Sequence, residues 1–153
     1  MANRSQMPAG SYIEHRTTVR VRFCEVDSLQ VVWHGHYLKY FEDAREALGR
    51  RFGISYADIR DAGLIAPLVH ASCEYLAPAR AGDELDIVAR LFLRDSAKIE
   101  FFYEVRRPAD SALLAVGRTV QVFTDVRGEL LLTLPQFMES FYRRWNSEAI
   151  GNP

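Results

Sequence analysis

Hydrophobic and polar residues alternate near the start of the chain in the manner of a β-strand. Between residues 17 and 26, Thr17, Val19, Val21 and Phe23 fall on one face, while threonine and arginine side chains fall on the other. A period of two residues with β-branched side chains is typical of a strand that is buried on one face. The pattern therefore predicts a strand over residues 17–26.

A helical pattern replaces this alternation near His34. Apolar residues then recur at spacings of three and four and form one stripe: Tyr37, Phe41, Ala44, Leu48 and Phe52. Gly53 follows directly and is suited to the left-handed position that ends many helices. We predict a helix of about 18 residues, roughly 27 Å long, whose apolar stripe must be covered by a broad partner.

The rest of the chain is rich in predicted strands. Residues 55–63 carry the signature of a short helix, because Ser55 is followed three positions later by Asp58. Strands are then predicted over 68–76, 84–93, 98–107, 113–126 and 129–134, and Pro135 opens a terminal helix. This order predicts an α+β protein, in which an antiparallel sheet of about five to six strands wraps around one long central helix.

Length and charge limit the classes of protein to which the chain could belong. With 153 residues we expect a flexible leader over 1–15, a single domain over 16–146 and a tail over 147–153. The formal net charge is −1, from 19 basic and 20 acidic residues, which argues against a nucleic-acid-binding protein. The chain has neither an apolar run of the ~18 residues that span a membrane nor a signal peptide, so a cytoplasmic location is expected by default.

The two cysteines do not indicate a disulfide or a metal site. Cys24 and Cys73 both fall within predicted strands, and the sequence has no C-x-x-C pair. We therefore expect both to be buried thiols, and we predict no metal site.

One segment, residues 23–37, concentrates titratable and aromatic side chains between the first strand and the long helix. Asp27 lies seven residues before His34, where the helix begins. Free N–H groups and the helix dipole at that point favour negative charge on an oxygen, and a carboxylate can attack a carbonyl or deprotonate water. These are the minimal parts of an acyl-transfer site. Spacing alone favours an ordinary turn aspartate at Asp27 and a solvated histidine at His34, and it leaves Trp33 and His36 compatible with core packing.

This segment resembles the signature of 4-hydroxybenzoyl-CoA thioesterase-like hot-dog proteins. The resemblance rests on the pattern E-x-D-x-x-x-V-V-W-H-x-x-Y-x-x-Y-F-E-x-A-R from Glu25 to Arg45. A second block, from Glu74 to Asp83, and the Leu134-Pro135 pair also fit, so that the resemblance covers residues 17–143. The group includes the short-chain acyl-CoA thioesterases associated with the bacterial Tol-Pal system, and the resemblance implies a hot-dog fold.

The resemblance also implies roles for individual residues. Asp27 matches the catalytic aspartate, and His34 the position whose backbone N–H polarises the thioester carbonyl, with its imidazole as a candidate for assisting. Five further residues are expected to line the substrate pocket: Gln30, Val32, Trp33, His36 and Tyr37. Because phosphates need basic partners, Arg80 and Lys98 are candidates for binding the phosphates of coenzyme A, and both are also compatible with ordinary solvated charges. Many relatives have glycine where this chain has Leu29 or Gln30, which leaves the shape of the pocket open.

The resulting hypothesis is an enzyme that hydrolyses a short-chain or aromatic acyl-CoA to a carboxylic acid and free coenzyme A. No metal or separate cofactor is expected, because coenzyme A is part of the substrate. The resemblance implies a homodimer or homotetramer with active sites between subunits. Two alternatives remain open: a thioesterase acting on acyl-carrier protein, and a non-catalytic acyl-CoA-binding regulator with the same fold.

Overall fold

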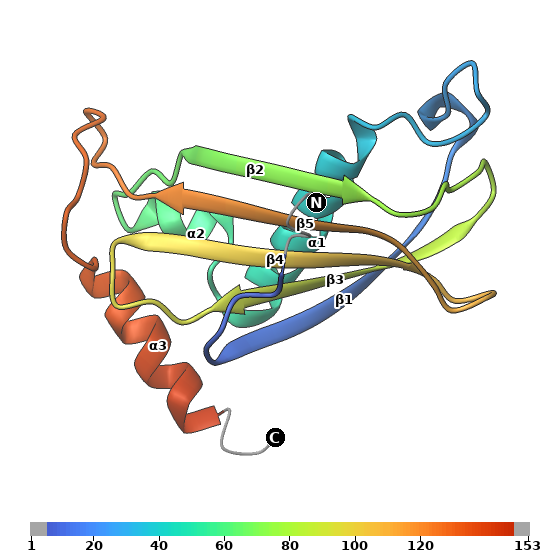
Figure 1. Cartoon of the computed structure of the whole chain (residues 1–153). Helices are drawn as coiled ribbons and strands as arrows, with labels where there is room; N and C mark the ends of the chain where they lie inside the picture. Colours follow the sequence, from blue (N-terminus) through green and yellow to red (C-terminus); the bar gives the residue numbers. More distant parts are fainter. Residues whose placement is uncertain (1–5, 149–153) are drawn as a thin grey trace.

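A curved antiparallel sheet that packs against one long helix forms the body of the protein (Figure 1). The computed structural model describes residues 6–148, and their side chains as far as residue 145. The strands are β1 (Tyr12–Arg20), β2 (Leu68–Tyr75), β3 (Glu84–Phe92), β4 (Lys98–Arg107) and β5 (Ala112–Val122). The helices are the 3-10 turn η1 (Phe23–Glu25), α1 (His36–Phe52), α2 (Tyr56–Asp61) and α3 (Gln136–Glu148).

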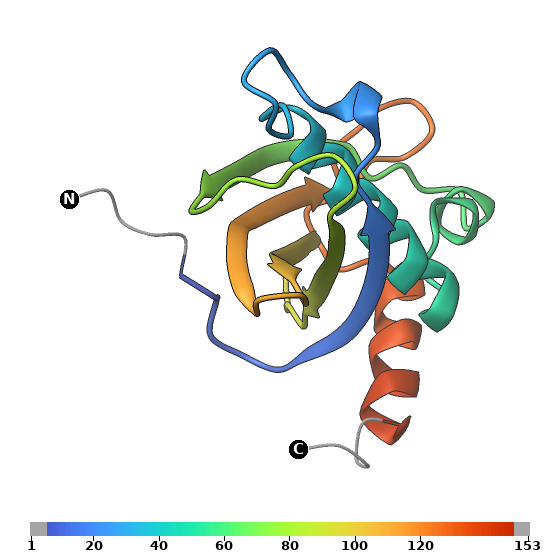
Figure 2. The ribbon, with the colours of Figure 1, turned by 90° about the vertical axis from the view of Figure 1, so that its right-hand side faces the viewer.

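The five strands lie in the order β1-β3-β4-β5-β2, and every neighbouring pair is antiparallel. The first two strands of the chain therefore form the two edges of the sheet, and α1 and α2 connect one edge to the other. Seen end-on, the sheet curls and α1 lies on its concave side (Figure 2). This arrangement confirms the predicted hot-dog architecture, with five strands rather than six.

The predicted apolar stripe faces the sheet. Tyr37, Phe41, Ala44 and Leu48 are each no more than 3% exposed. The ring of Phe41 stacks on that of Tyr103 on β4, with centroids 4.4 Å apart and planes 8° from parallel. Covering the stripe removes about 2 kcal/mol of unfavourable hydration for each large apolar side chain, so this contact fixes the position of α1 on the sheet.

Close contact between α1 and the sheet depends on a glycine in β5. A Cβ atom added at Gly117 would lie 2.2 Å from Cε2 of Phe41 and 2.9 Å from the backbone oxygen of Ser72. A larger residue at this position would therefore force α1 away from the sheet. This is how the sequence lets an aromatic ring of the helix rest directly on the strand.

Several predicted boundaries were wrong. β1 begins at Tyr12, inside the predicted leader, and ends at Arg20 because the chain turns into η1, which leaves Phe23 86% exposed. Cys24 is therefore exposed rather than buried, whereas Cys73 on β2 is half-buried. Residues 129–134 form only an isolated bridge between Leu130 and Thr124. α3 extends into the predicted tail as far as residue 148, and the remaining tail lies outside the described residues.

No helix within residues 6–148 is long and apolar enough to cross a membrane.

Candidate functional site

The segment between β1 and α1 folds into a compact loop, which we call the site loop (residues 21–35). Val26 and Val32 form an antiparallel bridge. The Asp27 N–H donates to the Val31 carbonyl (3.0 Å), and the Trp33 N–H donates to the Glu25 carbonyl (2.9 Å). These bonds give the loop a hairpin-like base with Asp27 at one end of its turn.

Asp27 is a turn aspartate as well as the predicted catalytic carboxylate. Its Oδ1 accepts a hydrogen bond from the Leu29 N–H at 2.8 Å, and its carbonyl accepts one from the Gln30 N–H at 2.9 Å. The side chain is partly exposed. Within the described residues, Oδ2 has no hydrogen-bond partner and no cation pairs with the carboxylate. The local structure thus orients the carboxylate and leaves one oxygen available to a substrate or a water molecule.

Gln30 occupies the left-handed region of the backbone, with φ of 59°. A residue with a Cβ atom adopts this conformation at a cost of about 1 kcal/mol, whereas glycine adopts it freely. Gln30 is therefore a strained residue at the tip of the site loop. The side chain of Gln30 is exposed at the tip of the turn.

The start of α1 presents backbone donors near the loop. Gly35 is the N-cap residue and supplies no side-chain cap. The His36 N–H donates to the Trp33 carbonyl at 2.9 Å, whereas within residues 6–148 the N–H groups of His34 and Gly35 donate to no other group. Free donors at the positive end of a helix dipole are suited to binding an anionic oxygen.

Aromatic rings surround this helix start. The ring of Trp33 lies 4.8 Å from the ring of His34 and 5.7 Å from that of His36. Trp33 is 46% exposed, and His36 is partly buried with no hydrogen-bond partner for its Nδ1 among the described residues. Tyr37 is 3% exposed and contacts the ring of Tyr75 at 5.2 Å. Of the predicted pocket residues, Trp33 and Gln30 are thus open to a ligand, while Val32 and Tyr37 pack into the core.

A second turn, which we call the bracing turn (residues 78–83), holds the site loop from the side. The Ala79 carbonyl accepts from the Val32 N–H at 2.9 Å, and the Asp83 carbonyl accepts from the Val21 N–H at 2.9 Å. Arg80 lies in this turn, and its N–H donates to Oδ2 of Asp83 at 2.9 Å. The second motif of the sequence therefore lies directly beside the first.

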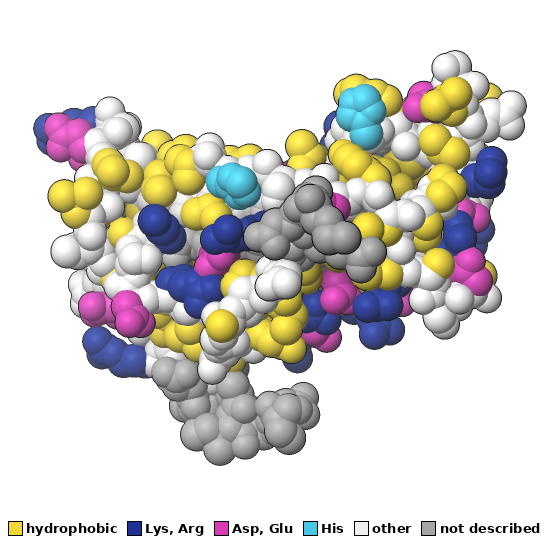
Figure 3. Space-filling model, viewed as in Figure 1, with side chains coloured by type: hydrophobic (Ala, Val, Ile, Leu, Met, Phe, Trp, Pro, Cys, Tyr) yellow, Lys and Arg dark blue, Asp and Glu magenta, His cyan; other side chains and the backbone are white. Residues whose placement is uncertain are grey.

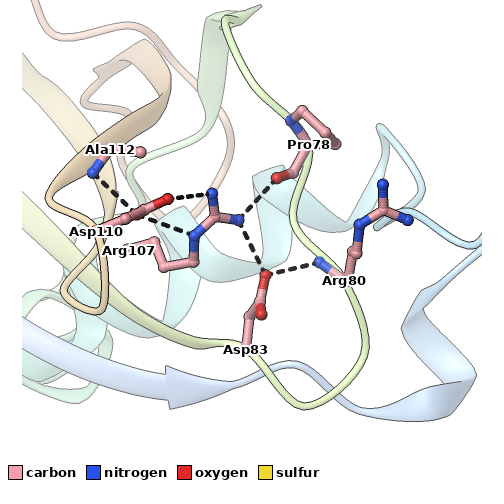
Figure 4. A network of polar contacts seen from close by, with 6 residues as sticks. All are labelled: Pro78, Arg80, Asp83, Arg107, Asp110 and Ala112. Carbon is pink, nitrogen blue, oxygen red and sulfur yellow. Dashed lines mark hydrogen bonds and ion pairs between the residues drawn. The ribbon is translucent and has the colours of Figure 1, made fainter.

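Arg107, at the end of β4, fixes the bracing turn (Figure 4). Its Nη1 donates to the Pro78 carbonyl and to Asp83, each at 3.1 Å, and its Nη2 pairs with Asp110 at 2.7 Å. These hydrogen bonds with Asp110 and Asp83 raise the pKa of Arg107. The guanidinium of Arg80 points away from this network, and among the described residues it has no partner, so it remains available to an anion.

The two predicted phosphate-binding residues lie far apart in one chain. Lys98 begins β4, next to Val122, whereas Arg107 and the bracing turn lie at the opposite end of that strand. At about 3.3 Å per residue, the length of β4 separates Lys98 from Arg80 by roughly 30 Å. A single chain therefore does not join these residues in one site.

Sequence reasoning did not assign a site role to Tyr75 or to Arg107. The hydroxyl of Tyr75 donates to the His34 carbonyl at 2.8 Å. Tyr75 lies in the second sequence motif, and this was the one sequence signal that could have pointed to it. The contact itself forms because β2 lies beside the site loop, which a local sequence pattern does not encode. Cys73, which lies two residues before Tyr75 on β2, is a poor nucleophile, because burial raises the pKa of its thiol to about 11.

Comparisons with known proteins identify the family of the chain. The model of the thioesterase-like superfamily matches residues 21–143. A putative esterase of Aquifex aeolicus is 36% identical over 84 residues, which are 55% of this chain and 64%, just under two thirds, of that protein. The 1,4-dihydroxy-2-naphthoyl-CoA hydrolase of Rippkaea orientalis is 28% identical over 129 residues, covering 80% of this chain and 94% of that one.

Solved structures share the fold. The crystal structure of a 1,4-dihydroxy-2-naphthoyl-CoA thioesterase from Synechocystis superposes with a TM-score of 0.76 at 24% identity, covering 87% of this chain and 98% of that one. This likeness confirms the hot-dog fold. The finer resemblance, to the 4-hydroxybenzoyl-CoA and Tol-Pal-associated branch, stays a prediction.

Proposed function

Because the chain belongs to the thioesterase-like superfamily, we propose that it hydrolyses an acyl-CoA thioester, with Asp27 as nucleophile or general base. One observation carries the proposal. A carboxylate with a free oxygen lies in the same compact loop as the N–H groups of His34 and Gly35, which precede α1 and are unpaired within the described residues. A carboxylate beside such donors can attack, or activate water against, a carbonyl whose oxygen the donors stabilise.

The reaction replaces the C–S bond with a C–O bond. In the general-base form, Asp27 accepts a proton from water as the water oxygen attacks the carbonyl carbon. The His34 N–H binds the carbonyl oxygen as it becomes negative, and the thiolate of coenzyme A leaves and takes a proton. In the nucleophilic form, Asp27 itself attacks, and water then hydrolyses the mixed anhydride.

The acyl group is the finer part of the proposal. The candidates are short-chain and aromatic acyl groups, and two features favour testing aromatic ones first. Trp33 exposes an indole ring at the loop, and the relative from Rippkaea orientalis is named for an aromatic CoA thioester. An aromatic acyl group can stack on such a ring, which is worth about 1 kcal/mol.

We propose that Arg80 binds the phosphates of coenzyme A. It lies in the bracing turn, and its guanidinium is unpaired among the described residues. A charge-assisted bond to phosphate is among the stronger hydrogen bonds in proteins. Lys98 fits this role only if another subunit brings it near the site loop.

A homodimer or homotetramer is part of the proposal. β2 is an edge strand, and among its residues Leu68, Val69 and Tyr75 are 48–59% exposed. Hydrophobic side chains gather along the upper rim of the molecule, which is hollowed between the loops at its two ends (Figure 3). An exposed apolar edge strand is normally covered, and a second copy along β2 would cover it beside the site loop.

The test is a hydrolysis screen over short-chain, longer-chain and aromatic acyl-CoAs, with an acyl-carrier-protein thioester included. We expect Asp27→Asn to lower kcat by about 100-fold or more, because the carboxylate supplies the attacking group. Asn can keep the turn hydrogen bond, so the fold should persist.

Asp125→Asn is the matched control. Asp125 also accepts backbone N–H bonds in a turn, from Arg127 at 2.8 Å and Glu129 at 3.0 Å, but it lies outside the site loop. If Asp27→Asn retained wild-type rates, the role of Asp27 would be wrong. Binding of coenzyme A without hydrolysis of any thioester would favour the non-catalytic regulator.

A further inference from the structure

Tyr75 links the edge strand β2 to the start of α1. It is the last residue of β2, and its hydroxyl donates to the backbone carbonyl of His34 at 2.8 Å across 41 positions of sequence. Burial raises the pKa of Tyr75 to about 12, so the hydroxyl keeps its proton at neutral pH and remains a donor. Its ring packs edge-on against Tyr37, with centroids 5.2 Å apart.

The atom that Tyr75 contacts belongs to the same peptide unit as the N–H of Gly35. A trans peptide is planar, and its C=O and N–H point in opposite directions. Holding the His34 carbonyl toward β2 therefore directs the Gly35 N–H away from β2. A hydrogen bond to the carbonyl also polarises the peptide and makes its N–H a stronger donor.

The Gly35 N–H is free to act on a ligand. Within residues 6–148 it donates to no other group, and neither does the N–H of His34. Trp33 packs closely over this peptide, since a Cβ atom added at Gly35 would lie 2.2 Å from its ring. The carbonyl contact with Tyr75 and this ring contact together restrict the orientation of the peptide.

We propose that Tyr75 is a positioning residue for thioester hydrolysis, which holds the His34–Gly35 peptide so that the Gly35 N–H joins that of His34 in binding the thioester oxygen. The inference rests on the proposed function. Tyr75 itself touches neither the reacting carbonyl nor the carboxylate of Asp27 in this scheme. Because it lies on the exposed edge strand, a partner that covers β2 would also stabilise the catalytic peptide.

Tyr75→Phe separates positioning from packing. Phenylalanine keeps the ring contact with Tyr37 and removes only the hydroxyl. Tyr75 is 50% exposed and His34 is exposed, so water can solvate the freed carbonyl and the fold should be preserved, but mobile water does not hold the peptide in one orientation. A lost neutral hydrogen bond corresponds to about a fivefold effect, and a lost oxyanion donor to about 100-fold.

The experiment compares kcat and KM of the full-length wild type, Tyr75→Phe and Tyr56→Phe on the acyl-CoA that the wild type cleaves fastest. Tyr56 is the matched control, since it is 44% exposed and its hydroxyl donates to Glu42 at 2.9 Å, away from the site loop. We expect kcat of Tyr75→Phe to fall between about 5-fold and 100-fold with KM nearly unchanged, and Tyr56→Phe to match the wild type.

A second measurement does not depend on activity. In a two-dimensional ¹H–¹⁵N spectrum, the Gly35 amide should shift in Tyr75→Phe, because its nitrogen senses whether the carbonyl of the same peptide is hydrogen-bonded. Unchanged kcat with an active wild type, or an unmoved Gly35 amide, would overturn the inference. A wild type that cleaves no thioester would instead overturn the proposed function, whatever the spectrum shows.

Discussion

Gly117→Ala should destabilise the protein by overpacking the contact between α1 and the sheet. The added Cβ atom would lie 2.2 Å from Cε2 and 2.4 Å from Cζ of Phe41, and 2.9 Å from the Ser72 carbonyl oxygen. Phe41 cannot move away easily, because it is 1% exposed and stacked on Tyr103. Overpacking of a closely packed core costs about 1–3 kcal/mol, and contact with a backbone atom places this site at the upper end, near 3 kcal/mol.

Urea denaturation followed by circular dichroism measures this loss as a change in the free energy of unfolding. Gly53→Ala is the control, because Gly53 has φ of 77° and no heavy atom within 4 Å of an added Cβ. That substitution should cost only the backbone strain of about 1 kcal/mol.

A double variant tests the mechanism directly. Phe41→Leu removes the two ring atoms that the new Cβ would strike, so Gly117→Ala should cost at least about 1 kcal/mol less in the Phe41→Leu background than in the wild type. If the costs of Gly117→Ala and Phe41→Leu simply add in the double variant, the proposed steric contact is wrong. A loss of less than about 0.5 kcal/mol for Gly117→Ala alone would also refute the reasoning, since about 0.5 kcal/mol is the precision of such measurements.

Two further predictions concern backbone strain and acid stability. Gln30→Gly should raise the free energy of unfolding by about 0.5 kcal/mol, since relief of strain at φ of 59° exceeds the entropy that glycine loses on folding. Ser111→Gly is the matched comparison, because Ser111 has φ of 60°. If urea titrations showed that Gln30→Gly is less stable than the wild type, the reasoning would be contradicted. Burial alone would raise the pKa of Glu104, but Arg90 and Arg106 lower it below its ordinary value of 4.5. The stabilisation from Glu104 is therefore present above pH 4.5 and is lost as the pH falls through the lowered pKa. Thermal midpoints measured from about pH 7 to pH 3 should fall less steeply for Glu104→Gln than for the wild type, and parallel curves would disprove this.

The long helix could be predicted from the sequence because its signal is local and repeated. Five apolar positions at spacings of three and four defined the stripe, and Gly53 marked the end, which the structure confirms with φ of 77°. The strand boundaries near the site were less predictable. Val21 and Phe23 continue the alternation of β1, yet Val21 is 2% exposed and Phe23 86% exposed. Hydrogen bonds between the site loop and the bracing turn end the strand there, and a local pattern does not encode them.

The candidate site also contains some residues that a local sequence pattern indicates and others that it does not. Asp27 and the helix start could be named as candidates because both lie within one continuous segment that carries a family-like motif. Tyr75 and Arg107 were not assigned, because their contacts join strands that are distant in sequence. Lys98 was named as a candidate only because its charge suits a phosphate, and its distance from Arg80 became visible only with the register of β4.

The contact of Arg107 with the bracing turn has a consequence for how the site forms during synthesis. The site loop is made early, but the side chain that fixes its neighbouring turn belongs to the end of β4. At ~5–20 residues per second, the chain between them takes on the order of 4–16 s to appear. The site loop therefore lacks this support while it is a nascent segment, and it would also lack it in a peptide cut from the protein. We therefore expect a variant that slows the pairing of β4 to delay the final ordering of the site loop, even where the substituted residue does not contact that loop.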